Sequence, residues 1–310
     1  MAFKRFPSFR LITPAVLAAS LFIIPACGPT EGPVGDTADT GKDVIGNVTG
    51  VKVKGQNFMM PSPVQIALLV RSSNVGYDKT LLNPTSNVSN YNDKMKWALN
   101  IGVYGADLGY ITMYEQTPEA LPYFNTVRKL GDNLKITASF DEKLMTRFSE
   151  NIGKNRDSVL AIVGEAYRRS DDFLKQGERD EDAALILTGG WIESMHFAVD
   201  VQKKKPSNEV STRIAEQKNT VSNLIKLLVS VGTDPNTNTL KEAYQPLIDK
   251  LNDLNSVYQG IVIKYNFSAP THDEDKHLTT INGTTDVKIT EEQLKLFGEK
   301  IVAIRDYIIN

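Results

Sequence analysis

Two short motifs combine a carboxylate and an imidazole at a spacing that suits metal binding. Glu193-Ser-Met-His196 lies in a strongly helical stretch, and Glu274-Asp-Lys-His277 repeats the same spacing. Residues three positions apart lie on one face of a helix, so each pair could offer an oxygen and a nitrogen ligand to one ion. The motifs therefore raise the hypothesis of a metal site, with Glu193 and His196 as its first candidate ligands.

A complete site of this kind needs two helices that carry the motif and two that supply bridging glutamates, as in ferritin-like di-iron proteins, whose pattern the motifs resemble. The second motif lies in THDEDKH, which follows Pro270 and is polar on every face, so it is expected to form a solvated loop. Glu165 is the one further glutamate that is well placed. The favoured interpretation puts His196 beside the core and assigns no catalytic residue, while a di-iron-like or hydrolytic enzyme remains the alternative.

Other chemical motifs are incomplete. Asp234-Pro-Asn-Thr-Asn begins like a calcium-binding loop, but Thr239 stands where the sharp turn needs Gly, and Gln245 where the ion needs a bidentate Glu. The sequence has no Gly-x-Ser-x-Gly motif, no phosphate-binding Gly loop and no dinucleotide fingerprint. Glycoside hydrolysis needs only two carboxylates, so a hydrolase stays open. We expect no cofactor other than a covalent lipid.

Small residues form stripes along one predicted helix. The stripes hold Ala98, Gly102 and Ala106, with Gly105 and Gly109 offset from them. Glycine costs up to about 1 kcal/mol relative to alanine inside a helix, so several glycines in one helix suggest a specific use. We predict close approach of a neighbouring helix, namely the one that contains Gly189 and Gly190. A ligand packed against the bare backbone is the alternative.

The only cysteine follows an amino-terminal leader. The first ten residues carry Lys4, Arg5 and Arg10 and no acid, and the apolar stretch LITPAVLAASLFII comes next. A basic region, an apolar region and a small residue before the cleavage point make a secretory signal, and this apolar run is shorter than the roughly 20 residues that span a bilayer. Ile24-Pro25-Ala26-Cys27 resembles the lipobox of bacterial lipoproteins.

The resemblance implies a diacylglyceryl group on Cys27, cleavage before that residue and attachment to a membrane through two or more acyl chains. Gly28 follows the cysteine in place of the Asp that resembles an inner-membrane retention signal, so we expect the outer membrane. An ordinary secreted protein and an uncleaved anchor are the alternatives. No second cysteine exists, so the mature chain must fold without a disulfide.

Three segments are expected: a signal peptide at 1–26, the lipidated Cys27 with a flexible Gly-, Thr- and Asp-rich tether at 27–60, and an all-helical domain at 61–310. Apolar residues recur every three or four positions through most of that domain, which predicts a bundle of eight or nine helices. Asn282-Gly283 lies between β-branched runs and predicts one small β-hairpin at about 277–289. The predicted helices cover about 62–70, 90–115, 117–130, 139–152, 157–175, 180–204, 207–231, 239–258 and 290–308. Ser207 is a predicted N-cap, and capping boxes are predicted at Ser139 to Glu142, Thr239 to Glu242 and Thr290 to Gln293.

Composition and charge narrow the functional classes. Removal of the leader with its three cations would change the net charge of the chain from −2 to −5. A mildly acidic protein of this kind lacks the basic surface that binds nucleic acid. ALNIGVYGADLGYITMYEQ and ALPYFNTVRKLGDNL are similar to stretches in uncharacterised helical lipoproteins of Gram-negative bacteria. We therefore expect a non-catalytic binding or scaffolding module of the cell envelope, held to the membrane by its lipid, with an envelope protein or a small ligand as its partner.

Overall fold

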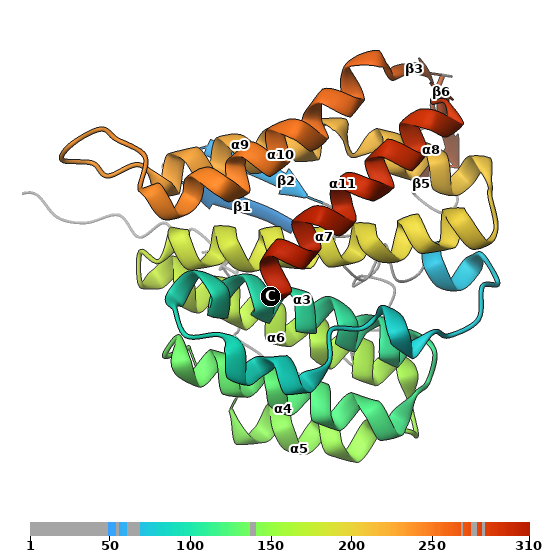
Figure 1. The fold of residues 1–310 in the computed structure, drawn as a ribbon. Coiled ribbons are helices and arrows are strands. Elements are labelled where there is room, and N and C mark those ends of the chain that lie inside the picture. Colours follow the sequence, from blue (N-terminus) through green and yellow to red (C-terminus); the bar gives the residue numbers. More distant parts are fainter. Residues whose placement is uncertain are drawn as a thin grey trace, which may run out of the picture. The chain divides into compact units, whose positions relative to one another are not determined.

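A computed structural model describes residues 49–53, 56–60, 69–136, 141–267, 269–273, 278–280 and 283–310. All of them belong to one compact unit, Asp39–Asn310. The predicted all-α class is confirmed, since helices make up most of the described chain (Figure 1). Its α-helices are α3 (Lys94–Met113), α4 (Thr117–Asn133), α5 (Glu142–Asn151), α6 (Arg156–Gln176), α7 (Asp180–Lys204), α8 (Asn208–Glu216), α9 (Lys218–Gly232), α10 (Gln245–Val257) and α11 (Glu291–Ile309).

Helices α3 and α7 form the centre of the unit. Every residue of α3 from Ala98 to Met113 is buried, which explains why its sequence is apolar on most faces. Helix α7 begins with three acidic residues and ends with two lysines, an order that suits the helix dipole. Helices α4 and α6 pack on α3, whereas α9 and α11 pack on α7 (Figure 1). One continuous apolar core joins these helices.

Several predicted helix boundaries are confirmed and others are wrong. Ser207 caps α8, and Thr290 with Gln293 forms the predicted capping box of α11. The helix predicted over 207–231 breaks at Gln217, whose buried side chain accepts a hydrogen bond from Trp191 Nε1 at 3.1 Å. A local sequence pattern could not predict this contact, because Trp191 and Gln217 lie 26 positions apart.

Two other predicted capping boxes are not used. Asp141 is the N-cap of α5, where its carboxylate accepts a hydrogen bond from the Leu144 amide, and Ser139 lies outside the described residues. The backbone around Thr239 instead closes an extended loop, because its carbonyl accepts a hydrogen bond from the Asp234 amide at 2.9 Å. Helix α10 therefore starts at Gln245, after a short 3-10 helix, Glu242–Tyr244.

The strands form small antiparallel ladders. Strands β3 (Val262–Phe267) and β6 (Gly283–Lys288) pair with each other, as do β4 (Thr271–Asp273) and β5 (Leu278–Thr280). A hairpin is thus present near 277–289, but its predicted turn is wrong, because β5 and β6 pair with the preceding strands and not with each other. Asn282 itself lies outside the described residues.

A further hairpin occupies part of the predicted tether. Strands β1 (Thr49–Val53) and β2 (Gln56–Met60) pair antiparallel, and they contact α7 and α9. The alternation VKV in β1 and the aromatic Phe58 in β2 are strand signals that the Gly-, Thr- and Asp-rich composition of the whole segment obscured. The predicted signal peptide, Cys27 and the remainder of the predicted tether lie outside the described residues.

Candidate functional site

The glycines of α3 and α7 let the two helices touch backbone to backbone. A Cβ atom added to Gly102 would lie 2.0 Å from the Ile186 carbonyl oxygen and 2.5 Å from the Gly190 nitrogen. One added to Gly189 would lie 1.9 Å from the Leu99 carbonyl oxygen. No side chain fits at such distances, so α3 and α7 approach each other closely at Gly102, Gly189 and Gly190, the positions at which the sequence led us to expect close packing.

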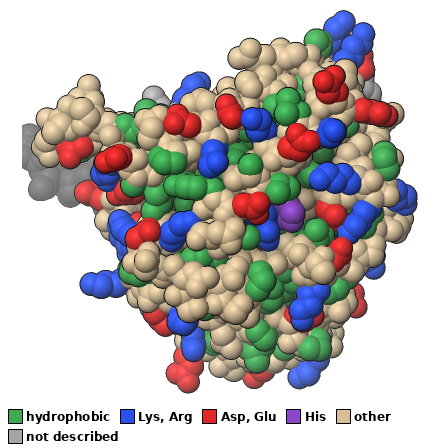
Figure 2. All heavy atoms as spheres, viewed as in Figure 1, with side chains coloured by type: hydrophobic (Ala, Val, Ile, Leu, Met, Phe, Trp, Pro, Cys, Tyr) green, Lys and Arg blue, Asp and Glu red, His purple; other side chains and the backbone are tan. Residues whose placement is uncertain are grey.

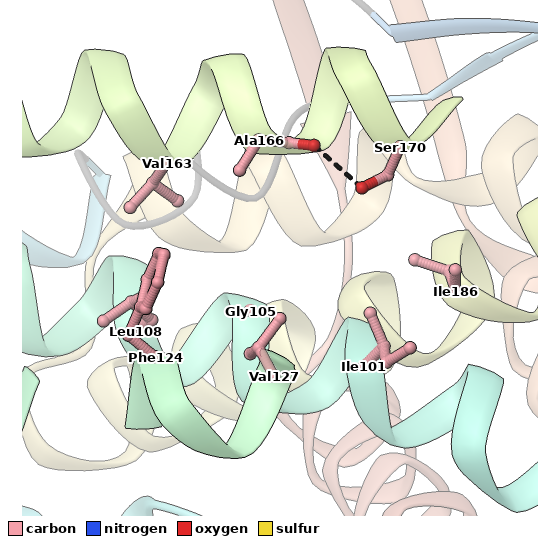
Figure 3. Close-up of a pocket in the computed structure, with 9 residues that line it drawn as sticks. All are labelled: Ile101, Gly105, Leu108, Phe124, Val127, Val163, Ala166, Ser170 and Ile186. Atoms are coloured by element: carbon pink, nitrogen blue, oxygen red, sulfur yellow. Dashed lines mark hydrogen bonds between the residues drawn. The ribbon is translucent and has the colours of Figure 1, made fainter. Parts of the chain in front are cut away.

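Gly105 and Gly109 have different surroundings. Gly105 borders a small void between α3, α4, α6 and α7, whose volume is about 30 Å³ (Figure 3). The void is lined by apolar side chains and by Ser170, whose hydroxyl already donates to the Ala166 carbonyl at 2.8 Å. A space of this size holds about one water molecule and no organic ligand. A Cβ on Gly109 would meet nothing within 4 Å.

The carboxylate of Glu193 binds a guanidinium and not a histidine. Arg305 of α11 donates from Nε to Oε2 at 2.6 Å and from Nη2 to Oε1 at 2.8 Å. Glu193 is fully buried, and Arg305 is 8 % exposed. Both carboxylate oxygens are therefore engaged in a two-pronged ion pair, which is a strong and directional geometry. Arg305 Nη2 also donates to the Leu81 carbonyl at 2.8 Å, so the pair ties α7, α11 and the segment before α3 together.

A second buried acid, Asp107 of α3, completes this cluster. It is fully buried, and its Oδ2 accepts a hydrogen bond from the Asn83 amide at 3.2 Å. Burial, together with the neighbouring Glu193 carboxylate, raises the pKa of Asp107 well above its ordinary value. Sequence reasoning missed both Asp107 and Arg305. The sequence did carry a signal for both residues. Asp107 is the only charged residue in the stretch GVYGADLGY, and Arg305 lies in the otherwise apolar stretch IVAIRDYII, next to Asp306.

His196 lies one turn from Glu193 on α7 but makes no bond to it. Burial lowers the pKa of His196, so the ring is neutral at pH 7, and its Nδ1 has no hydrogen-bond partner within the described chain. Glu165, the predicted third ligand, lies elsewhere, where it pairs with Arg147 and Arg169 at 2.6 Å each. The described residues contain no group of three or more potential metal ligands. Glu274 and His277 lie outside the described residues.

The polar side chains near the start of α3 hold the end of α11. Lys96 Nζ donates to the Tyr307 carbonyl at 2.6 Å, and Asn100 Nδ2 donates to the Ile308 carbonyl at 3.0 Å. The Tyr91 hydroxyl donates to the Ile309 carbonyl at 3.2 Å. The last carbonyls of a helix have no partner within it, so these three side chains satisfy the end of α11 inside the fold.

The larger described cavity is a surface cleft of about 230 Å³. It lies where the turn between α3 and α4 meets the turn between α5 and α6. Its polar lining includes Gln116 and Thr117 from the first turn, and Lys154, Asn155 and Arg156 from the second. Arg156 is engaged by Glu115 at 3.5 Å and Asp157 at 3.1 Å, which leaves the cleft close to neutral. Acidic and basic side chains are likewise interspersed over the face drawn in Figure 2.

Comparison with known proteins gives no relatives. No protein-family model, no curated protein and no solved structure matches this chain. Among the described residues, no helix combines the length and the apolar character needed to cross a bilayer.

Proposed function

We propose that the protein is a lipoprotein of the bacterial cell envelope whose helical unit acts as a non-catalytic binding or scaffolding module. In this proposal Cys27 carries the lipid, the outer membrane is the site of attachment, and the helical unit contacts an envelope protein or a small ligand. The lipobox-like Ile24-Pro25-Ala26-Cys27 supports the anchor.

The ion pair between Glu193 and Arg305 is the observation that carries the non-catalytic part. Glu193 was the best candidate for chemistry in the sequence, but its two oxygens each lie within 2.8 Å of an Arg305 nitrogen in the interior. A metal ligand or general base needs a free lone pair directed at a site that substrate can reach. The geometry therefore favours a structural use of Glu193 over chemistry in the core. We place the proposed binding at the polar cleft near Lys154, the larger described cavity.

The anchor is tested by intact mass and fractionation of the full chain expressed in a Gram-negative host. We expect the mass to correspond to residues 27–310 plus acyl groups, and we expect the protein in the outer-membrane fraction. Cys27→Ala should yield an unlipidated protein that leaves the membrane fraction. An unlipidated mass for the wild type, or a Cys27→Ala variant that stays in the membrane, would contradict the proposal.

Whether Glu193 and His196 bind a catalytic metal ion is tested by elemental analysis of the purified full chain. We expect no stoichiometric iron or zinc and the same metal content in His196→Ala. Stoichiometric metal that is lost in His196→Ala would instead favour the metal-enzyme alternative. Cross-linking in intact cells from a probe at Lys154, with an equivalent probe at Lys226 on α9 as the control, then tests whether the cleft contacts a partner.

A further inference from the structure

The buried cluster of Asp107, Glu193 and Arg305 has one negative charge too many. Two carboxylates face a single guanidinium in a region where Asp107 and Glu193 are fully buried. An uncompensated charge in the protein interior costs several kcal/mol, so a buried cluster is expected to be neutral overall. The cluster therefore needs one more positive charge, which must come from another cationic side chain or from a bound proton.

The hydrogen bonds show where that charge is missing. Arg305 bonds to both oxygens of Glu193, and the Asn83 amide bonds to Asp107 Oδ2. Asp107 Oδ1 is buried and receives no hydrogen bond from any described residue. A carboxylate oxygen without a donor in the interior is costly, whereas a protonated oxygen becomes a donor itself. A protonated Asp107 could donate this hydrogen bond to the neighbouring Glu193 carboxylate.

No other group on the packed elements provides the charge. Among the described residues, His196 is the further base that interacts with Glu193 and Arg305, and burial lowers its pKa, so it is neutral at pH 7. The remaining titratable groups are phenols, which carry no positive charge. The described titratable groups that interact with Asp107 are Glu193 from α7, Arg305 from α11, Tyr104 from α3 itself, Tyr123 from α4 and Tyr91 from the segment before α3. His196 of α7 interacts with Glu193 and Arg305, and Asp200 and Lys203 lie near its ring.

We propose that Asp107 carries a proton on Oδ1, where it can donate to Glu193, and that the chain takes up this proton when α11 packs against α3 and α7. The neutral cluster then consists of an acid, a carboxylate and a guanidinium. In the absence of α11, Arg305 no longer covers the site and both acids can be hydrated and ionised. The proton is thus part of the contact that holds α11 in place.

The proposal predicts the sign of the pH dependence. An unfolded Asp loses its proton near its ordinary pKa of 3.8, whereas the folded chain keeps the proton on Asp107 to a much higher pH. The folded state therefore binds one more proton than the unfolded state above about pH 4, and this site makes the folding equilibrium constant fall about tenfold for each pH unit. The decrease ends once the pH passes the raised pKa of Asp107.

The test compares the full chain with Asp107→Asn by denaturant unfolding between pH 4 and pH 9. The asparagine is neutral and retains a donor toward Glu193. We expect the ratio of the variant's folding constant to that of the wild type to rise about tenfold per pH unit from about pH 4, and then to level off. Asp253→Asn, which removes a largely exposed partner of Lys300, is the control and should show no such rise.

A ratio that stays constant with pH would overturn the proposal. If Asp107→Asn fails to fold, the wild type itself decides the question through carbon NMR or infrared spectroscopy of its carboxyl groups. A protonated side-chain carboxyl in the folded wild type at pH 7, lost on unfolding at the same pH, is the expected result. Full ionisation of all side-chain carboxyls in the folded chain at pH 7 would refute it.

Discussion

Gly189 approaches Leu99 so closely that a Cβ atom on the glycine would lie 1.9 Å from the leucine carbonyl oxygen. The same contact is repeated at Gly102, where a Cβ would meet the Ile186 carbonyl oxygen at 2.0 Å. The backbones of α3 and α7 are thus each other's packing surface at these points. Any side chain larger than hydrogen must force the helices apart or bend them.

Gly189→Ala should therefore be strongly destabilising. Overpacking a rigid core costs about 1–3 kcal/mol, and a clash with backbone atoms allows less relaxation than a clash with a side chain. We expect a loss at or above the upper end of that range, measured as the free energy of unfolding in denaturant.

Gly109→Ala is the matched control on α3, because a Cβ there meets nothing within 4 Å. Alanine is better than glycine inside a helix, so this variant should be neutral or more stable by up to about 1 kcal/mol. Equal losses for Gly109→Ala and Gly189→Ala would show that helix contact is not the reason for the glycines.

Arg305→Met should destabilise the fold by about 3–5 kcal/mol, because it removes the one cation from a buried pair and leaves Glu193 without its partner. Adding Glu193→Leu to this variant should recover a large part of the loss. Denaturant unfolding of both single variants and the double variant gives the coupling energy. If the double variant loses the sum of the two single losses, the ion pair is not a coupled unit.

Asn100→Ala should loosen the end of α11. Its side-chain amide donates to the Lys96 carbonyl at 2.9 Å and to the Ile308 carbonyl at 3.0 Å, and both bonds are lost. A buried group left without its partner costs about 1–3 kcal/mol. Faster amide hydrogen exchange over 300–309, with α5 unaffected, is the expected signature. Asn236→Ala, in an exposed loop, should stay within about 0.5 kcal/mol of the wild type.

The pair between Asp78 and Lys204 should contribute to acid sensitivity. Hydrogen bonds from Lys204 and Thr80 lower the pKa of Asp78 to about 2 from its ordinary 3.8. A lowered acid pKa adds stability that is complete above about pH 4 and lost as the pH falls toward 2. Asp78→Asn should thus be slightly less stable than the wild type at pH 7, with the difference gone near pH 2 in an acid titration. A difference that grows as the pH falls would contradict this assignment.

Local patterns predicted the helices well because the periodicity of apolar residues is itself a product of burial on one face. The bounds predicted for α7, 180–204, agree with the structure, and the box Thr290 to Gln293 opens α11 as expected. The prediction lost accuracy where a distant group decides the local structure. Gln217 ends α8 beside Trp191, which lies 26 positions earlier in the chain.

In the candidate site, too, local features could be predicted from the sequence and distant contacts could not. The sequence indicated that the helices of Gly102 and Gly189 approach each other closely, because both helices carried unusually small residues. It could not show that Glu193 pairs with Arg305, because 112 residues separate them and any buried cation would satisfy the same carboxylate. A lone charge inside an apolar helix does signal a buried partner. Asp107 and Arg305 each carried that signal, and only the three-dimensional arrangement shows that they share one cluster.

The position of α11 has a consequence for biosynthesis. A ribosome that has completed only the chain up to α10 has produced α3 and α7 without the helix that neutralises Glu193, so their polar contact surface still faces water. The buried contact between Glu193 and Arg305 can form only after α11 has been made.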